Sequence, residues 1–135
     1  MEIVKTITLV FAEIELLENG IIRVNMFDKT SIGEVESRHI NNAIGELSEG
    51  KPARIMMVPQ PNTVFDHGAR EFSASEEGLQ YTIGDALVVN SLAHKILANF
   101  YLKFNKPRKP SKAFDQEEAA IAWLLSLEDP AKADT

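Results

Sequence analysis

Apolar and polar residues alternate near the start of the chain, between residues 11 and 17. A period of two is typical of a half-buried strand, and it puts Glu13 and Glu15 on the outward face. Asn19-Gly20 follows, a dipeptide that tolerates positive φ at both positions, and a second apolar run extends over 21–27. We therefore expect the fold to open with a β-hairpin.

Beyond the hairpin, apolar residues recur at helical spacing in four stretches. The residues expected to cap these helices are Ser31, Asp66, Ser91 and Asp115, with Glu34 and Glu118 completing capping boxes in the first and the fourth. Gly50 is expected to end the first helix, and Pro107 forbids the third from continuing.

Three short predicted strands alternate with these helices: the apolar runs 53–58 and 86–89, and the segment 111–114 between Pro110 and Asp115. The first of them lacks alternation, which is typical of a central strand covered on both faces. The element order ββαβαβαβα favours parallel pairing with right-handed crossovers, and the hairpin adds an antiparallel edge. The sequence thus predicts an α/β fold, with an N-terminal β-hairpin followed by βα units around a mixed, largely parallel sheet.

The composition is that of one globular domain. The chain has 135 residues, of which 44% are hydrophobic and 25% charged, and it has no cysteine, so disulfides and cysteine-bound metals are excluded. We expect a single domain over residues 1–130 and a flexible tail over 131–135. No apolar run is long enough to cross a membrane and the N-terminus lacks signal-peptide features, so we expect a cytoplasmic protein. The formal net charge of −6 argues against nucleic-acid binding.

The sequence offers little catalytic chemistry. His39, His67 and His94 fall on different predicted elements, and none has a second histidine three or four residues away. A glycine-rich phosphate loop, a nucleophile elbow and a zinc-protease pair are all missing from the sequence. These patterns predict no metal, no cofactor and no catalysis, with His39 and His94 in structural or solvent-facing positions. A hydrolase that uses His67 with a distant carboxylate is the least favoured alternative.

The most informative segment for binding is 65–72, because ligands of parallel α/β sheets bind beyond the carboxyl ends of strands, where the next helix begins. Free backbone N–H groups at such a place can meet an anion or a partner's carboxylate. We expect a protein partner to contact this segment through four residues: Asp66, His67, Gly68 and Arg70. For Asp66 itself, a simple helix cap is the favoured explanation.

A second candidate surface is basic. Five cationic side chains gather between the third helix and the last strand: Lys103, Lys106, Arg108, Lys109 and Lys112. They have two possible explanations: a solvated loop, or a docking patch for an acidic partner, a nucleic acid or an anionic headgroup. In a docking patch, the expected contacts are Lys106, Arg108 and Lys109. The nearby Phe100, Tyr101 and Phe104 recur at core spacing, so we expect most of them inside.

The second half of the chain resembles a family of small bacterial proteins. The family pattern is A-hydrophobic-V-N-S, then N-F-aromatic-L and N-K-P, matched here by 86–92 and 99–107. The family pattern continues with Pro, then a hydroxyl residue or Lys, then Phe, and residues 110–114 match it. It ends in an acidic helix with Trp-Leu, which 122–124 match. Such proteins resemble the STAS (SpoIIAA-like) fold of anti-sigma-factor antagonists, a small βα superhelix also related to lipid-carrying Sec14-type domains.

The resemblance implies a non-catalytic regulatory module that binds a protein partner. Antagonists of this type carry a phosphorylatable serine in an Asp-Ser-Ser-Gly pattern, where this chain reads Asp66-His67-Gly68, so a kinase-controlled switch is not expected there. Ser73 and Ser75 are the nearest hydroxyls. The alternative function is a Sec14-like carrier of a small apolar ligand or lipid, held between the helices and the sheet. Exposed hairpin edges also allow a homodimer.

Overall fold

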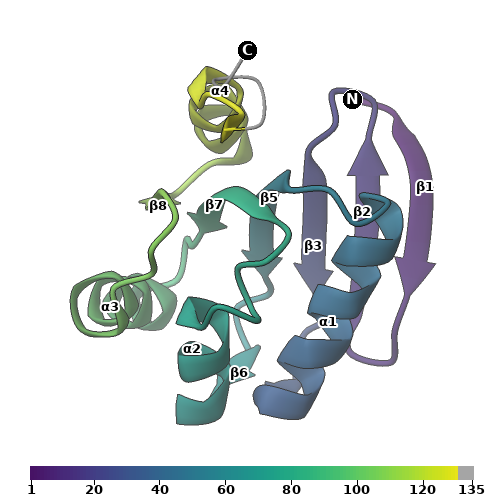
Figure 1. Cartoon of the computed structure of the whole chain (residues 1–135). Helices are drawn as coiled ribbons and strands as arrows, with labels where there is room; N and C mark the ends of the chain where they lie inside the picture. Colours follow the sequence, from purple (N-terminus) through teal and green to yellow (C-terminus); the bar gives the residue numbers. More distant parts are fainter. Residues whose placement is uncertain (131–135) are drawn as a thin grey trace.

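A six-stranded mixed sheet forms the centre of the computed structural model, which describes residues 1–130 (Figure 1). In spatial order its strands are β1(Ile3–Thr8), β2(Ala12–Leu17), β3(Ile22–Met26), β5(Ala53–Pro59), β7(Thr82–Val88) and β8(Ser111–Phe114). The first three pair antiparallel, and β3, β5, β7 and β8 run parallel. The predicted α/β class with a mixed, mostly parallel sheet is confirmed. The predicted tail, 131–135, lies outside the described residues.

The predicted hairpin is formed by β2 and β3, with Ile14 opposite Val24. Gly20 adopts a φ of 88°, and the Asn19 side chain accepts a hydrogen bond from the backbone N–H of Ile21 at 3.0 Å. The sequence analysis missed β1, which pairs with the outer side of β2. Five of its six residues are exposed, so no alternation of burial marks this strand in the sequence.

The four predicted helices are present, and two of their predicted caps are confirmed. The helices are α1(Glu34–Leu47), α2(His67–Ala74), α3(Leu92–Phe100) and α4(Glu117–Ser126). Asp66 accepts a hydrogen bond from the backbone N–H of Ala69 at 2.9 Å, and Ser91 accepts one from that of His94 at 3.1 Å. A π-helical turn, η1(Tyr101–Asn105), continues α3 and ends before Pro107.

The predicted cap of α1 is wrong. Ser31 lies in the short strand β4(Ser31–Ile32), which pairs in parallel with β6(Val64–Phe65). This pairing keeps the backbone extended, so the helix begins two residues later than the capping box suggested. Gly33 occupies the N-cap position, and the Glu36 side chain accepts a hydrogen bond from its N–H at 2.9 Å.

The predicted cap of α4 is wrong as well. Gln116 occupies the N-cap position, and Asp115 lies one residue before it. The backbone leaves β8 at Phe114 and stays non-helical through 115–116, which moves the helix start beyond Asp115. Glu117 and Glu118 therefore fall in the first turn, where their charge complements the helix dipole.

The helices cover both faces of the sheet, so the sheet has two cores. α1, α2 and α3 lie over one face and α4 over the other (Figure 1). Ile55 of β5 faces the α1 side and Met56 the α4 side, which confirms the predicted central strand. The α1 side buries Ala12, Ile14, Ile22, Val24, Met26, Ile32, Ile40, Ala43, Ile44, Leu47, Ala53, Ile55 and Ala69. The α4 side buries Leu17, Ile21, Met56, Ala86, Val88, Ala120 and Leu124.

Glu15 is buried, contrary to the outward position predicted for it. Its side chain is 4% exposed and accepts hydrogen bonds from Arg23, at 2.8 Å from Nε, and from Asn25. Arg23 also reaches Glu117 of α4 at 3.1 Å. The alternation in β2 gave the wrong result because α4 covers part of the second face, where an ion pair takes the place of apolar side chains.

Phe100 and Phe104 are exposed, contrary to the prediction that most of the aromatic residues here lie inside. The buried residues of α3 and η1 are His94, Ala98 and Tyr101, and through them the helix packs against the rest of the domain. α3 lies at the end of the sheet away from β1 (Figure 1), so its outward row stays largely exposed, although Phe100 also contacts Arg70 of α2. Within residues 1–130 no helix is long and apolar enough to cross a membrane.

Candidate functional site

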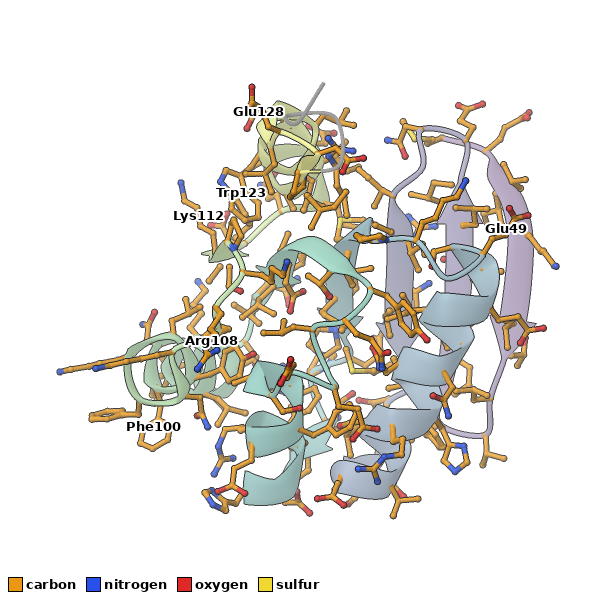
Figure 2. The ribbon with its side chains drawn as sticks, viewed as in Figure 1. Glu49, Phe100, Arg108, Lys112, Trp123 and Glu128 are labelled. Atoms are coloured by element: carbon orange, nitrogen blue, oxygen red, sulfur yellow. The ribbon has the colours of Figure 1, made fainter. Side chains whose placement is uncertain are left out.

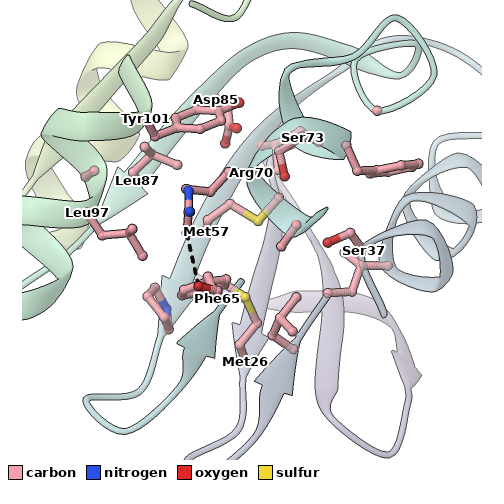
Figure 3. Close-up of a pocket in the computed structure, with 18 of the residues that line it drawn as sticks. Met26, Ser37, Met57, Phe65, Arg70, Ser73, Asp85, Leu87, Leu97 and Tyr101 are labelled. Carbon is pink, nitrogen blue, oxygen red and sulfur yellow. Dashed lines mark hydrogen bonds between the residues drawn. The ribbon is translucent and has the colours of Figure 1, made fainter. Parts of the chain in front are cut away.

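A cavity of about 130 Å³ lies between the sheet and the helices α1, α2 and α3 (Figure 3). Most of its wall is apolar: Met26, Ile32, Ile40, Ile44, Ile55, Met57, Pro59, Phe65, Ala69, Phe72, Leu87, Val89, Leu97 and Ala98. Eight polar side chains also line it, and three of them come from different elements: Asp85 from β7, Arg70 from α2 and Tyr101 from η1. The other five are Ser37, Asn41, Ser73, Thr82 and His94. A mostly apolar cavity with a few convergent polar groups is the usual form of a small-ligand site.

Asp85 lies in the middle of an inner strand. Its backbone pairs with Ile55 on one side and Ser111 on the other, and its N–H donates to the carbonyl of Pro110 at 2.9 Å. The residue is 6% exposed, and its side-chain oxygen Oδ1 has no hydrogen-bond partner. Burial raises the pKa of the Asp85 carboxyl to about 7, because the charged form is poorly solvated there. Near neutral pH this carboxyl can therefore donate or accept a hydrogen bond.

Tyr101 approaches the same space from the first residue of the π-helical turn. The residue is buried and its hydroxyl has no hydrogen-bond partner. Burial, and then the charge of Asp85, raise the pKa of the Tyr101 hydroxyl, so the group stays protonated. Figure 3 draws the Tyr101 ring beside the Asp85 carboxyl, and both side chains line the cavity.

Arg70 is the third polar group of the cavity. Its Nη1 donates to the backbone carbonyl of Phe65 at 3.2 Å, and its guanidinium carbon lies 5.6 Å from the centre of the Phe100 ring. These contacts hold the guanidinium in place but leave Nε without an acceptor. One N–H donor is thus free within the cavity wall (Figure 3).

Unpartnered polar atoms are concentrated at this cavity. Among residues 1–130, four buried side-chain nitrogen or oxygen atoms lack a hydrogen bond, and three of them belong to Asp85, Tyr101 and Arg70. The fourth is Nδ2 of Asn19, in the hairpin turn. Because buried polar groups in native proteins are nearly always satisfied, three orphans around one cavity indicate a place for a polar molecule.

His94 borders the cavity but is already engaged. Its Nε2 lies 2.7 Å from the backbone carbonyl oxygen of Thr63, and its ring contacts Phe65 edge-on at 5.7 Å between centres. These contacts fasten the start of α3 to the loop before β6. The role of His94 is therefore structural.

The residues predicted around Asp66 separate in the structure. The Asp66 side chain caps α2, and His67, 72% exposed, pairs with Glu71 at 2.7 Å. A Cβ at Gly68 would lie 3.2 Å from Oδ1 of Asp66 and 3.4 Å from the backbone nitrogen of Glu34, so Gly68 lies between the cap of α2 and the start of α1. Only Arg70 lines the cavity.

The predicted basic residues lie elsewhere, in the segment that leaves α3. Lys106, with a φ of 49°, follows η1, and Arg108 and Lys109 lie between it and β8 (Figure 2). None of these three lines the cavity. Within the described part of the chain, no three histidine or acidic side chains come together as metal ligands would.

Sequence reasoning missed Asp85 and Tyr101. The predicted strand 86–89 began too late to include Asp85, since β7 starts at Thr82. Extending that strand backwards would have placed an aspartate inside a buried run, which is a recognisable signal of a special environment. Nothing in the sequence marks Tyr101, because helical periodicity alone does not tell a cavity-facing residue from a core residue.

Residues 15–128 match the family described as a domain of unknown function, DUF7793. The chain belongs to this family. This DUF7793 chain is similar to a protein with unknown function from Arthrobacter sp. FB24, whose crystal structure is known. The two sequences are 20% identical, and the alignment covers 84% of this chain and 98% of the Arthrobacter chain, with a TM-score of 0.31. Among curated proteins none matches the DUF7793 chain. The resemblance to STAS domains stays a prediction.

Proposed function

We propose that this DUF7793 domain binds a small, largely apolar molecule in the cavity between the sheet and α1–α3. The supporting observation is that three unpartnered polar atoms, on Asp85, Tyr101 and Arg70, border one apolar space. Each such atom costs about 1–3 kcal/mol when left unsatisfied. A ligand that hydrogen-bonds to them removes this cost and also buries apolar surface.

The volume of the cavity limits the size of the ligand. An apolar cavity of about 150 Å³ holds a molecule such as benzene, so a cavity of about 130 Å³ suits a similar small body. Of the two ligands that the sequence analysis allowed for a carrier, the small apolar molecule fits better than a long-chain lipid. A long acyl chain would require the helices to move apart.

The polar groups indicate the chemistry of the head group. Arg70 Nε–H is a donor, the Tyr101 hydroxyl can donate or accept, and the Asp85 carboxyl can do both near neutral pH. An uncharged head group that offers a donor and an acceptor, such as an amide or an alcohol, satisfies all three. A carboxylate is less suitable, because it would meet Asp85 as the pH rises above its pKa.

We keep the non-catalytic, cytoplasmic character inferred from the sequence as part of this proposal. The finer STAS-like assignment, and the protein partner at Asp66–Phe72 that it implies, also stay predictions. In the structure the Asp66 side chain caps α2, the exposed His67 ring contacts Glu71, and Arg70 belongs to the cavity. These contacts favour the ligand-binding function over partner binding through that segment.

The test is titration of the purified protein with benzamide and benzyl alcohol, followed by NMR of the backbone amides. We expect saturable shifts in residues of the cavity wall, and about tenfold weaker binding by Tyr101→Phe, which removes one hydrogen-bonding group. Tyr81→Phe is the matched control, because Tyr81 is half-buried and does not line the cavity.

The same variants distinguish a loss of ligand contact from a loss of folding. Tyr101→Phe removes an unsatisfied buried hydroxyl, so without ligand it should be as stable as the wild type or more stable. Failure of both probes to bind, or equal binding by the wild type and Tyr101→Phe, would reject the proposal. Mass spectrometry of the recovered probes detects any turnover, and chemical conversion would reject the non-catalytic assignment.

A further inference from the structure

The outer side of α3 and η1 carries an exposed apolar row. Four large side chains recur every fourth residue, Leu92, Ile96, Phe100 and Phe104, with exposures of 74%, 61%, 45% and 61%. They point away from the buried row of the same helix, and the rings of Phe100 and Phe104 lie 4.7 Å apart. Figure 2 shows Phe100 on the outer side of the helix. Contiguous exposed apolar surface of this kind marks an interaction site.

Positive charge surrounds this row. Residues 91–114 include six lysines and arginines and no acidic residue, so the segment carries +6, whereas the other 111 residues have eight basic and 20 acidic side chains, or −12. Lys95 and Lys103 lie on α3 and η1 beside the apolar row, and Nζ of Lys103 is 5.4 Å from the centre of the Phe104 ring. Arg108 follows η1 in the chain, whereas Lys112 lies over the Phe114 ring, 5.5 Å from its centre, toward α4 (Figure 2).

We infer that this surface docks the protein on an anionic lipid bilayer. An exposed helix with a row of Phe, Leu and Ile beside Lys and Arg is suited to lie in the membrane interface, with its apolar row below the level of the headgroups. The basic side chains then attract the anionic headgroups. α3 stands at the end of the sheet away from β1 (Figure 1), so the row can reach a flat surface without obstruction by the rest of the sheet.

Charge argues against a second copy of the chain as the occupant. A two-fold dimer brings the same patch of both subunits together, and here that would place two +6 segments face to face. An anionic bilayer complements both features of the surface, its charge and its apolar row. The inference does not require a cavity ligand, because Leu92, Ile96 and Phe104 of the row do not line the cavity, and Phe100 is the member that contacts Arg70.

The experiment is co-sedimentation of the full chain with vesicles. One set is phosphatidylcholine alone, and the other has about one third phosphatidylglycerol. We expect binding to the anionic vesicles at least about tenfold stronger than to the neutral ones, and weaker binding at high salt. Equal or no binding to both sets would overturn the inference, whatever the result of the cavity titration.

Two sets of variants test the two features separately. The triple variant Leu92→Ser, Ile96→Ser, Phe104→Ser removes apolar surface but keeps Phe100, which contacts Arg70 of the cavity. Its control is Val10→Ser, since Val10 is 94% exposed in the turn between β1 and β2. We expect the triple variant to lose most vesicle binding at unchanged far-UV circular dichroism, and Val10→Ser to bind as the wild type does.

The charge variants have equal net charge. Lys95→Gln, Lys103→Gln, Arg108→Gln should abolish binding to anionic vesicles, whereas Lys5→Gln, Lys29→Gln, Lys51→Gln, which removes three exposed charges from other elements, should retain it. Equal loss in both would mean that only net charge matters and would overturn the docking surface. Sedimentation equilibrium without vesicles is the last arm, and a dimer abolished by the apolar triple variant would assign the surface to a second copy instead.

Discussion

Asp85 places a titratable carboxyl inside an inner strand, and this position makes stability depend on pH. Its pKa is about 7 in the folded protein, against an ordinary value of 3.8. Between these values the folded state holds a proton that the unfolded chain has released, so the free energy of unfolding falls as the pH rises and levels off above about 7.

We expect the wild type to lose roughly 2–3 kcal/mol of stability between pH 5 and pH 8, relative to Asp85→Asn. The asparagine side chain does not titrate, so other groups contribute equally to both proteins. Urea unfolding of the two proteins at several pH values measures the difference. Parallel stability profiles would show that the Asp85 carboxyl has an ordinary pKa in the folded state.

The residues of the candidate site show what a sequence pattern can and cannot reveal. Asp66 and Ser91 cap their helices as predicted, because a cap is a local interaction that short-range spacing encodes. Asp85 and Tyr101 meet only through the tertiary fold. The distance between them along the chain carries no signal, so the cavity could not be inferred from the sequence.

At the scale of elements, a partly buried ion pair links β2, β3 and α4 through Glu15, Arg23 and Glu117. Arg23→Met would leave the Glu15 carboxylate, 4% exposed, with Asn25 as its remaining partner. We expect the free energy of unfolding to fall by about 2–4 kcal/mol, because an uncompensated buried charge is costly.

The double variant Glu15→Gln, Arg23→Met should recover much of this loss, since it removes the charge together with its partner. Chemical denaturation of the wild type, both single variants and the double variant gives the coupling energy. Additive effects of the two single changes would indicate that the ion pair contributes nothing beyond its separate side chains.

The order of elements was largely predictable, whereas their ends were not. Helical spacing and apolar runs located all four helices and five strands of the central sheet. Ser31 was assigned to a cap because the sequence does not show β6, the strand with which it pairs. β1 was missed because it is an exposed edge strand, and edge strands need little apolar surface.

The whole molecule has two cores separated by one sheet, and we expect them to unfold together. Ile44 is buried on the α1 side, and Trp123, the single tryptophan, packs on the α4 side. Ile44→Ala should lower stability by about 2–5 kcal/mol through the cavity it creates. Because the sheet is common to both cores, Trp123 fluorescence and far-UV circular dichroism should report the same transition.

Val35→Ala is the control for this experiment, because Val35 is exposed on the same helix. It should leave the transition nearly unchanged. A fluorescence transition that keeps its wild-type midpoint in Ile44→Ala, while the circular dichroism transition shifts, would show that the two sides unfold independently.

The two faces of α3 meet different environments, and this divides the positions of the helix into two sets. Positions 94, 98 and 101 are buried beside the cavity, and positions 92, 96, 100 and 104 face outward. Evolution can therefore change one set without disturbing the other. A DUF7793 protein with polar residues at the second set and an intact first set would separate the two proposals. It should still bind a ligand in the cavity but should no longer dock on an anionic bilayer.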